Sequence, residues 1–378
     1  MENNSLQKIP ALKINDYPDV LNRAILSTFV FSNDFMLEYF RRAARCKYNE
    51  IVIFPKANIE LIKNPGIWLT NRSQNSIKEL AAAAKKFNME LIPEVNCLAG
   101  FNFSPVEEGA SIEKNIEHLL EPPAGTVPNW LKEGRKNKRI KRTFKMENEQ
   151  VYKLIFSVLD EVIELFDNPG RIHLGLDEAW DLGSSGYSKS NDVLYADHIS
   201  RLADYCRKKK VIMCMWGDHL FAPVQFLDEK GNLLEYNLHG GSPWNTAGAI
   251  DLIPKDIQIW SWHYRGYEKF PMLKILKDKG FSVYGVSWIN STNIVNIAKE
   301  VKNYQLDGYV STLWSLHVPR EINNPKSWKK QEYEVIPYGA EAAWNTDNAS
   351  ENICRYDGWK IMKDFLWQYV PEDKREIK

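Results

Sequence analysis

Eight short apolar segments recur along the chain, and stretches with helical periodicity lie between most of them. The strand-like segments cover residues 23–31, 50–55, 89–96, 171–176, 211–218, 257–264, 281–288 and 308–314. The helix-like stretches cover residues 34–46, 73–87, 149–166, 190–208 and 292–304, and a further one ends at 279. Parallel strands need long crossover connections, which are usually helices. The alternation therefore predicts an α/β fold of one domain, an eight-stranded (β/α)₈ barrel.

The barrel accounts for residues 21–320 and leaves an extension at each end. Residues 1–20 form a polar N-terminal extension, and residues 321–378 are expected to be a C-terminal helical segment packed on the barrel, with closing helical material at 350–369. Residues 100–147 are rich in proline, glycine and charge. We interpret them as a long insertion within the barrel, of the kind that commonly covers a site.

The bulk composition excludes several classes of function. The chain has 49 basic and 49 acidic side chains and therefore no net charge. Its overall charge thus gives no support for nucleic acid or an anionic membrane as a partner. No apolar run is long enough to span a membrane, and the first residues lack the pattern of a signal peptide, so we expect a cytoplasmic protein. The five scattered cysteines argue against a disulfide framework or a structural zinc site, and no cofactor is implied. A homodimer is compatible with the sequence.

Two adjacent carboxylates, Asp177 and Glu178, stand at the end of the fourth strand-like segment. Burying carboxylates is costly, and placing two side by side drives their pKa values apart. Such a pair can supply one proton donor and one fixed negative charge at neutral pH. In a barrel of this kind the active site lies at the C-terminal ends of the strands, where this pair falls. We therefore predict that Glu178 and Asp177 are catalytic.

Aromatic and acidic side chains also end the other segments. The predicted rim comprises Glu94, Asn96, Asp177, Glu178, Trp216, Asp218, Trp262, Tyr264, Trp288, Asn290 and Trp314. Aromatic faces stack on the apolar faces of sugar rings, and the sequence contains no glycine-rich loop that would hold a phosphate. The rim therefore predicts a carbohydrate site.

The motifs at these positions resemble those of family 20 glycoside hydrolases, the β-N-acetylhexosaminidases. The stretch His173-Leu174-Gly175-Leu176-Asp177-Glu178 is similar to the family signature His-x-Gly-x-Asp-Glu. The following Ala179 resembles a bacterial branch that reads Asp-Glu-Ala-His. Further resemblances, in chain order, are Arg23-Ala24-Ile25-Leu26, Met215-Trp216-Gly217-Asp218, Trp262-His263-Tyr264 and Thr312-Leu313-Trp314. The match extends over nearly the whole predicted barrel.

The resemblance implies hydrolysis with retention, in which the 2-acetamido group of the substrate is the nucleophile. By this resemblance Glu178 would protonate the glycosidic oxygen and later deprotonate water, and Asp177 would orient the acetamide N–H. Tyr264 would hydrogen-bond the acetamide carbonyl, and Arg23 would bind sugar hydroxyls. The remaining residues implied in substrate binding are Trp216, Asp218, Trp262, Trp288 and Trp314. The implied substrate is a carbohydrate with a terminal β-linked GlcNAc or GalNAc.

The chain departs from the family pattern at four places. Gly100 stands where the family has a histidine after the third strand, and Trp180 stands where the branch has its histidine after Asp-Glu-Ala. His263 replaces the aspartate of a Trp-Asp-Tyr triplet, and the segment 315–317, Ser-Leu-His, replaces acidic residues after the last strand. These changes leave the predicted acid in place and bear on its tuning and on the sugar that it accepts.

Two other functions compete with hydrolysis. Glu94, Asp177, Asp218 and His219 follow successive strands and could form a metal site, as in a metal-dependent sugar isomerase or epimerase. A carbohydrate-binding barrel without catalysis is the third alternative, suggested by the departures. Hydrolysis in which the acetamido group of the substrate is the nucleophile requires no metal, so the predicted hydrolase site includes no metal ligand.

Overall fold

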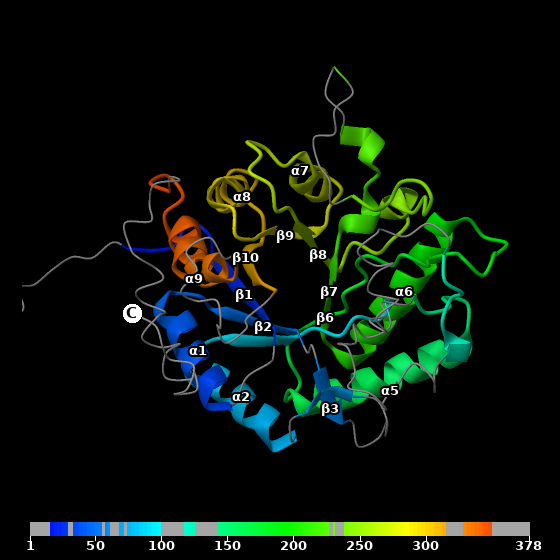
Figure 1. Cartoon of the computed structure of the whole chain (residues 1–378), viewed down its shortest axis with the longest axis horizontal. Helices are drawn as coiled ribbons and strands as arrows, with labels where there is room; N and C mark the ends of the chain where they lie inside the picture. The colour runs from blue at the N-terminus through cyan, green and yellow to red at the C-terminus, as the bar shows by residue number, and fades with distance from the viewer. Residues whose placement is uncertain are drawn as a thin grey trace, which may run out of the picture.

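The structure, a computed structural model, describes residues 16–28, 33–54, 57–60, 68–71, 74–99, 117–124, 143–226, 230, 238–314 and 328–349. Eight parallel strands form one sheet in the order β5-β2-β1-β10-β9-β8-β7-β6. They are β1 (Asn22–Thr28), β2 (Glu50–Phe54), β5 (Glu90–Pro93), β6 (Arg171–His173), β7 (Ile212–Trp216), β8 (Gln258–Trp262), β9 (Ser282–Ser287) and β10 (Gly308–Leu313). The predicted α/β barrel is confirmed (Figure 1).

The two edge strands of this sheet, β5 and β6, lie side by side, so the barrel is nearly closed. Glu94, just after β5, forms an isolated parallel bridge with His173 at the end of β6. The amide of Val95 donates a hydrogen bond of 2.8 Å to the carbonyl oxygen of His173, and Cys97 donates one of 2.8 Å to Leu174. The chain after β5 is therefore held beside the chain after β6, where the acid pair follows.

Helices cover the outside of the barrel, as Figure 1 shows. They are α1 (Asn33–Arg45), α2 (Gln74–Lys86), α5 (Glu149–Leu165), α6 (Asn191–Lys209), α7 (Pro271–Asp278), α8 (Ser291–Asn303) and α9 (Trp328–Trp344). Because side chains of a strand alternate between its two faces, neighbours in one strand belong to different cores. In β1, Ile25 packs in the larger core outside the sheet, whereas Ala24 and Leu26 join the smaller cluster inside the barrel.

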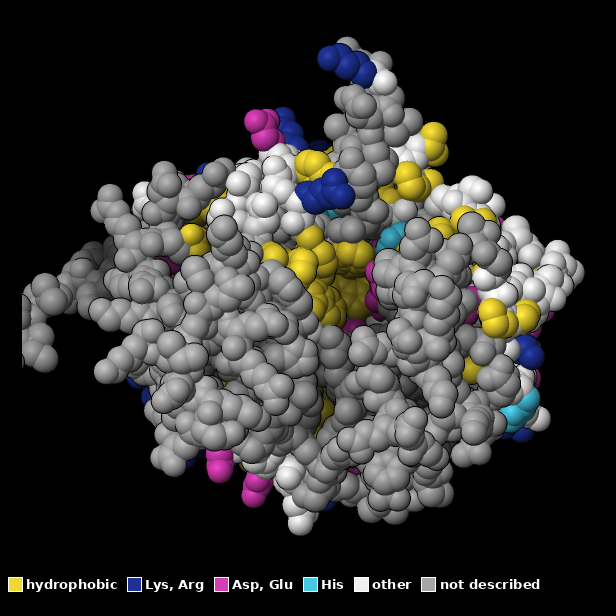
Figure 2. Space-filling view, viewed as in Figure 1, with side chains coloured by type: hydrophobic (Ala, Val, Ile, Leu, Met, Phe, Trp, Pro, Cys, Tyr) yellow, Lys and Arg dark blue, Asp and Glu magenta, His cyan; other side chains and the backbone are white. Residues whose placement is uncertain are grey.

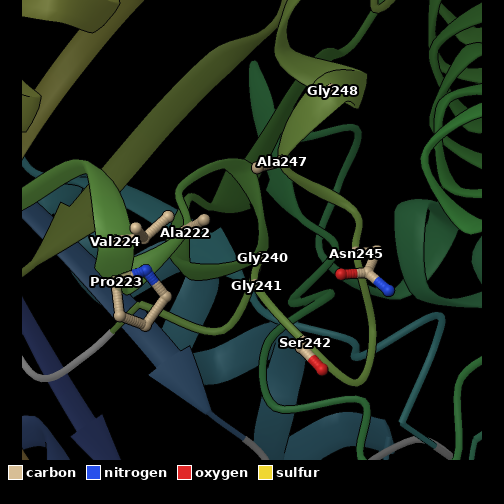
Figure 3. Close-up of a pocket in the computed structure, with 9 residues that line it drawn as sticks. All are labelled: Ala222, Pro223, Val224, Gly240, Gly241, Ser242, Asn245, Ala247 and Gly248. Carbon is tan, nitrogen blue, oxygen red and sulfur yellow. The ribbon is translucent and has the colours of Figure 1, made fainter.

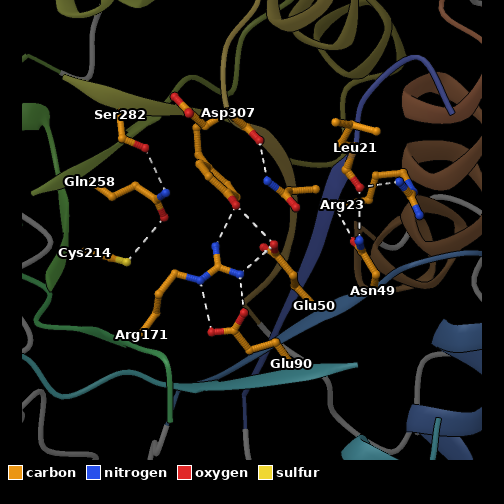
Figure 4. A network of polar contacts seen from close by, with 12 residues as sticks. Leu21, Arg23, Asn49, Glu50, Glu90, Arg171, Cys214, Gln258, Ser282 and Asp307 are labelled. Atoms are coloured by element: carbon orange, nitrogen blue, oxygen red, sulfur yellow. Dashed lines mark hydrogen bonds and ion pairs between the residues drawn. The ribbon is translucent and has the colours of Figure 1, made fainter. Parts of the chain in front are cut away.

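A buried ionic network joins strands at the amino-terminal end of the barrel (Figure 4). The guanidinium of Arg171 lies 2.6 Å from carboxylate oxygens of both Glu50 and Glu90, and it donates a hydrogen bond of 2.6 Å to the Tyr284 hydroxyl. Removing one partner of such a network would leave a buried charge without compensation. The network thus ties β6 to β2, β5 and β9 at the end away from the predicted site.

Helix α9 follows β10 and packs on α8, β10 and β1. It lies inside the expected C-terminal helical segment, but the sequence did not single it out, because Pro337 within it is unfavourable for a helix. Gly339 lets α9 lie close to β10, because a Cβ at this position would lie 1.9 Å from Oγ of Ser311. The closing helix expected at 350–369 lies outside the described residues, and the domain boundaries stay predictions.

Other connections depart from the simplest alternation. An antiparallel hairpin of β3 (Ala57–Glu60) and β4 (Trp68–Asn71) lies between β2 and α2. Within the predicted insertion at 100–147, only residues 117–124 and 143–147 are described. The first segment includes the short helix η2 (Glu117–Leu119), and the two segments meet in a bridge between Leu120 and Phe144. In the described segments, no helix combines the length and apolarity needed to cross a bilayer.

Candidate active site

The acid pair lies in a tight turn that directly follows β6. Gly175, Leu176 and Glu178 have φ angles of 66°, 72° and 48°, in the left-handed region. This conformation costs a residue other than glycine about 1–2 kcal/mol, so neighbouring groups must hold it. At Gly175 no side chain fits, because a Cβ would lie 2.6 Å from the side chain of Asn96. Asp177 and Glu178 are both partly exposed.

Asn96, from the segment after β5, fixes the carboxylate of Asp177. Its side-chain oxygen accepts hydrogen bonds from the amides of Leu98, at 3.1 Å, and Ala99, at 2.7 Å. This sets the orientation of the amide group, so its nitrogen points to Asp177 and donates to Oδ1 at 2.6 Å. The predicted rim residue Asn96 is therefore brought next to Asp177, as a donor to it.

Two side chains from the short helix η3 (Asp218–Leu220) hold the backbone of the same turn. The amide of Glu178 donates to Oδ2 of Asp218 at 3.0 Å, and the amide of Ala179 donates to Nε2 of His219 at 3.0 Å. Because Nε2 of His219 accepts, its ring is neutral and carries its proton on Nδ1, which lies 3.3 Å from the Thr246 hydroxyl. The strained turn is thus pinned from the β7 side.

The sequence predicted that Asp218 binds substrate; in the structure its side chain is buried among protein groups. Its Oδ2 accepts from Glu178 and also from Nδ1 of His239, at 2.7 Å, and its Oδ1 is enclosed by protein. Burial alone would raise the pKa of the Asp218 carboxyl, but the hydrogen bonds from His239 and from the amide of Glu178 hold it below its usual value. Asp218 is an anion that faces protein groups. No local signal in the sequence marks His239, which stands in a loop after β7.

Partly exposed aromatic side chains line the rim opposite the acid pair. The rings of Trp262 and Tyr264 have centroids 5.1 Å apart, and those of Tyr264 and Trp288 are 5.4 Å apart. The indole nitrogen of Trp314 donates to the Tyr264 hydroxyl at 2.9 Å. In the space-filling view, a hollow near the centre of the molecule is lined by hydrophobic side chains with acidic ones beside it (Figure 2). Four of the predicted aromatic residues are therefore assembled.

The phenol of Tyr264 lies within electrostatic reach of both acids. Burial raises its pKa above the ordinary value, and the negative charges of Glu178 and Asp177 raise it further, against the hydrogen bonds of Thr312 and Trp314. The hydroxyl therefore stays protonated at neutral pH and can act as a hydrogen-bond donor. The structure thus brings together Asp177, Glu178 and Tyr264.

Trp216 and Glu94 lie inside the barrel. Trp216 is 1% exposed, and its indole donates to the carboxylate of Glu94 at 2.9 Å. Its ring contacts those of His173, Trp260 and Trp314, at centroid distances of 4.4, 5.9 and 6.0 Å. Trp314 is thus partly exposed, whereas Trp216 is buried and packs against it.

Arg23 lies at the amino-terminal end of β1, away from the strand ends that carry the acid pair. Its guanidinium donates to the carbonyl oxygens of Lys47, at 2.8 Å, and Val20, at 2.7 Å, and Figure 4 draws it beside Leu21 and Asn49. This position excludes contact with a sugar bound at Asp177 and Glu178. The predicted role of Arg23 in sugar binding is therefore wrong, because the side chain binds backbone carbonyls below the barrel.

The predicted metal set is not assembled. Among the described residues, the candidate ligand atoms that lie within 4.8 Å of one another belong to Asp218, His219 and His239, without Glu94 or Asp177. In this group Nε2 of His219 accepts an amide proton, and Oδ2 of Asp218 accepts two hydrogen bonds. Two of the candidate ligand atoms are thus already engaged with protein donors, and the metal set predicted with Glu94 and Asp177 does not form.

A cavity of about 590 Å³ opens beside His239, between the loops that follow β7 (Figure 3). It is lined by Ala222, Pro223, Val224, Gly240, Gly241, Ser242, Asn245, Ala247 and Gly248. These residues belong to or flank the short helices η4 (Pro223–Phe226) and η5 (Ala247–Asp251). Its lining contains no ionisable side chain. Gly100 and residues 315–317 lie outside the described residues.

Comparison with known proteins points to one family. The model for glycosyl hydrolase family 20, catalytic domain, matches residues 63–346. No curated protein sequence gives a significant match.

Solved structures share the fold. The β-N-acetylhexosaminidase of Bacteroides fragilis is 17% identical, with a TM-score of 0.59 over 96% of this chain and 73% of its own. The exo-β-N-acetylglucosaminidase of Vibrio harveyi, solved with N-acetylglucosamine, is 15% identical, with a TM-score of 0.59 over 92% of this chain and 58% of its own. The chitobiase of Flavobacterium johnsoniae is 16% identical, with a TM-score of 0.56 over 92% and 51%.

This chain thus spans between half and three fifths of the Flavobacterium and Vibrio proteins. At such identities the likeness shows a common barrel, while the family match covers well over half of the 378 residues. The chain therefore belongs to glycosyl hydrolase family 20 and carries the catalytic domain of that family of glycoside hydrolases.

Proposed function

We propose that the chain removes terminal β-linked N-acetylhexosamine from a carbohydrate, with retention, and that the acetamido group of the substrate is the nucleophile. One observation carries the proposal. Of the four strand-end carboxylates, Glu94 and Asp218 are buried and engaged, and only Asp177 and Glu178 are partly exposed. A retaining mechanism with two protein carboxylates needs them on opposite sides of the bond, and neighbours in one turn do not meet this need.

The turn can divide the two roles. Glu178 would give its proton to the glycosidic oxygen while the acetamide oxygen attacks C1, so the C1–O bond breaks and an oxazolinium forms. Asp177, oriented by Asn96, would accept a hydrogen bond from the acetamide N–H and balance the developing positive charge. Glu178 would then take a proton from the water that attacks C1, which opens the oxazolinium and restores the acid.

The aromatic rim supports a substrate of this class. The protonated Tyr264 hydroxyl can donate to the acetamide oxygen, and Trp314 holds that hydroxyl in place. Trp262, Trp288 and Trp314 offer partly exposed faces on which a sugar ring can stack. The Vibrio and Bacteroides proteins are by name an N-acetylglucosaminidase and an N-acetylhexosaminidase, which agrees with the same substrate class for this chain.

The test is a panel of 4-nitrophenyl β-glycosides that differ at C2 and C4. GlcNAc and GalNAc glycosides carry the acetamide, whereas glucose and galactose glycosides carry a hydroxyl at C2. Turnover of an acetamido sugar with no detectable turnover of its hydroxyl counterpart is expected, because only the former brings a nucleophile. Equal turnover of both members of a pair would refute the proposal, and the C4 comparison would assign the preferred sugar.

A further inference from the structure

His239 is linked to the predicted acid through one carboxylate oxygen. Its backbone amide donates to the carbonyl oxygen of Asp218 at 2.8 Å, and its Nδ1 donates to Oδ2 of the same residue at 2.7 Å. The same Oδ2 accepts the amide of Glu178 at 3.0 Å. A single oxygen therefore joins the ring of His239 to the backbone of Glu178.

The ring of His239 is held from several sides. Trp180, which follows the acid pair, packs edge-on at a centroid distance of 4.8 Å. The ring of Trp262 lies 5.9 Å away and that of His219 lies 5.8 Å away. With its side chain 13% exposed, His239 stands between the aromatic rim and buried Asp218. Its place is fixed, so its hydrogen bond gives Asp218 one orientation.

That orientation matters because Glu178 holds an unfavourable backbone. At φ 48°, its peptide needs an acceptor in a defined place, and Oδ2 of Asp218 is that acceptor. Without His239, a buried carboxylate loses one of its donors and can rotate about its side-chain bonds. The amide of Glu178 would then lose its anchor, and the acid would lose its position at the glycosidic oxygen.

We propose that His239 is a positioning residue: by its hydrogen bond to Asp218 it holds the turn that places Glu178 for proton transfer to the leaving group. The inference rests on the proposed function and deepens it. It assigns to a loop after β7 the task of aligning an acid that follows β6. The role is one of hydrogen bonding, which a neutral donor in the same place can fulfil.

Leaving-group dependence separates this role from general damage to the site. A 2,4-dinitrophenyl β-glycoside departs without help from an acid, whereas a phenyl β-glycoside needs protonation. Loss of the position of Glu178 therefore slows cleavage of the phenyl glycoside alone. Damage to sugar binding or to folding slows both substrates alike. The readout is the ratio of the two kcat/KM values, which the fraction of folded protein does not affect.

The experiment measures this ratio for the wild-type chain and three variants, with the sugar that the wild type prefers. His239→Ala removes the donor, and His239→Asn keeps an amide N–H near the place of Nδ1. His118→Ala is the control, because it removes an exposed histidine far along the chain from this turn. For His239→Ala we expect kcat/KM to fall by about thirtyfold or more for the phenyl glycoside and by less than about threefold for the dinitrophenyl glycoside.

His239→Asn should recover most of the loss, and His118→Ala should match the wild type. Equal losses on both substrates in His239→Ala would overturn the proposal, as would a variant that keeps its full rate. An asparagine variant as slow as the alanine variant on the phenyl glycoside would overturn the hydrogen-bonding role. A wild-type chain that cleaves neither glycoside would overturn the proposed function and this inference with it. If the wild type is active but His239→Ala has the same ratio of the two kcat/KM values as the wild type, the inference alone is overturned.

Discussion

Asp177 and Glu178 are neighbours in sequence but are held by different groups. The carboxylate of Asp177 is fixed by the side-chain amide of Asn96, whereas Glu178 is held through its backbone by Asp218. The structure thus holds the side chain of Asp177 and the backbone of Glu178 by two separate groups. The sequence predicted the pair but not these partners, since they come from segments 81 and 40 residues away.

Replacing the predicted acid by its amide is the first test at this scale. Glu178→Gln keeps the shape of the side chain and removes the proton that it would transfer. We expect kcat/KM for 4-nitrophenyl β-GlcNAc to fall by more than about a hundredfold. Exposed Glu268 offers a matched control, and Glu268→Gln should keep the wild-type rate. A Glu178→Gln variant with the rate of the wild type would remove the assignment.

The partner carboxylate gives a second test. Asp177→Asn faces the donor nitrogen of Asn96 with an amide, so the hydrogen bond at 2.6 Å is lost unless the new side chain turns. The variant also lacks the charge that would balance an oxazolinium. We expect kcat to fall by about tenfold or more, with a smaller change in KM, because the charge acts mainly in the transition state. An unchanged kcat would show that Asp177 does not stabilise that state.

At the scale of elements, periodicity predicted the strands and most helices because buried strands and amphipathic helices leave strong local signals. It missed the β3–β4 hairpin, two short strands within the connection from β2 to α2. It also missed α9, because Pro337 and Gly339 are residues that disfavour a helix. Arg23 was assigned to sugar binding by resemblance to a family motif, but a motif does not give the position of a side chain along the barrel axis, and Arg23 binds backbone carbonyls at the amino-terminal end of β1. His239 was missed because nothing local marks a loop histidine whose partner is a distant carboxylate.

The turn after β6 makes a prediction about stability. Gly175→Ala combines a left-handed φ of 66° with a Cβ only 2.6 Å from Asn96. Gly186 has a similar φ of 71°, but an added Cβ there would meet nothing within 4 Å, so Gly186→Ala isolates the cost of backbone strain. We expect Gly186→Ala to lower the free energy of unfolding by about 1 kcal/mol and Gly175→Ala by clearly more. Urea denaturation measures both, and equal losses would contradict the described contact with Asn96.

At the scale of the whole molecule, buried histidines link stability to pH. Burial lowers the pKa of His173 well below its usual value and that of His198 to about 4. In the unfolded chain both would titrate near their usual pKa of about 6.5, so below that pH the unfolded state binds more protons. The two buried histidines therefore contribute fully to the free energy of unfolding above about pH 6.5, and this contribution is lost as the pH falls towards 4. Buried Glu50, whose pKa is raised by burial, acts in the opposite sense.

The variant His198→Gln tests this linkage. Glutamine fills a similar volume without a titratable group, so the free energy of unfolding should decrease less between about pH 7 and pH 5 than in the wild type. Urea denaturation at several pH values gives the two slopes. A variant with the same slope as the wild type would show that His198 does not contribute to the pH dependence.

The most direct test of the central claim is the affinity for a GlcNAc-derived thiazoline, a stable mimic of the oxazolinium. If the acetamide of the substrate is the nucleophile, the site that includes Asp177 and Tyr264 is complementary to the bicyclic intermediate. The thiazoline should then inhibit with a constant at least about a hundredfold lower than that of GlcNAc itself. A thiazoline that binds no more tightly than GlcNAc would contradict the account.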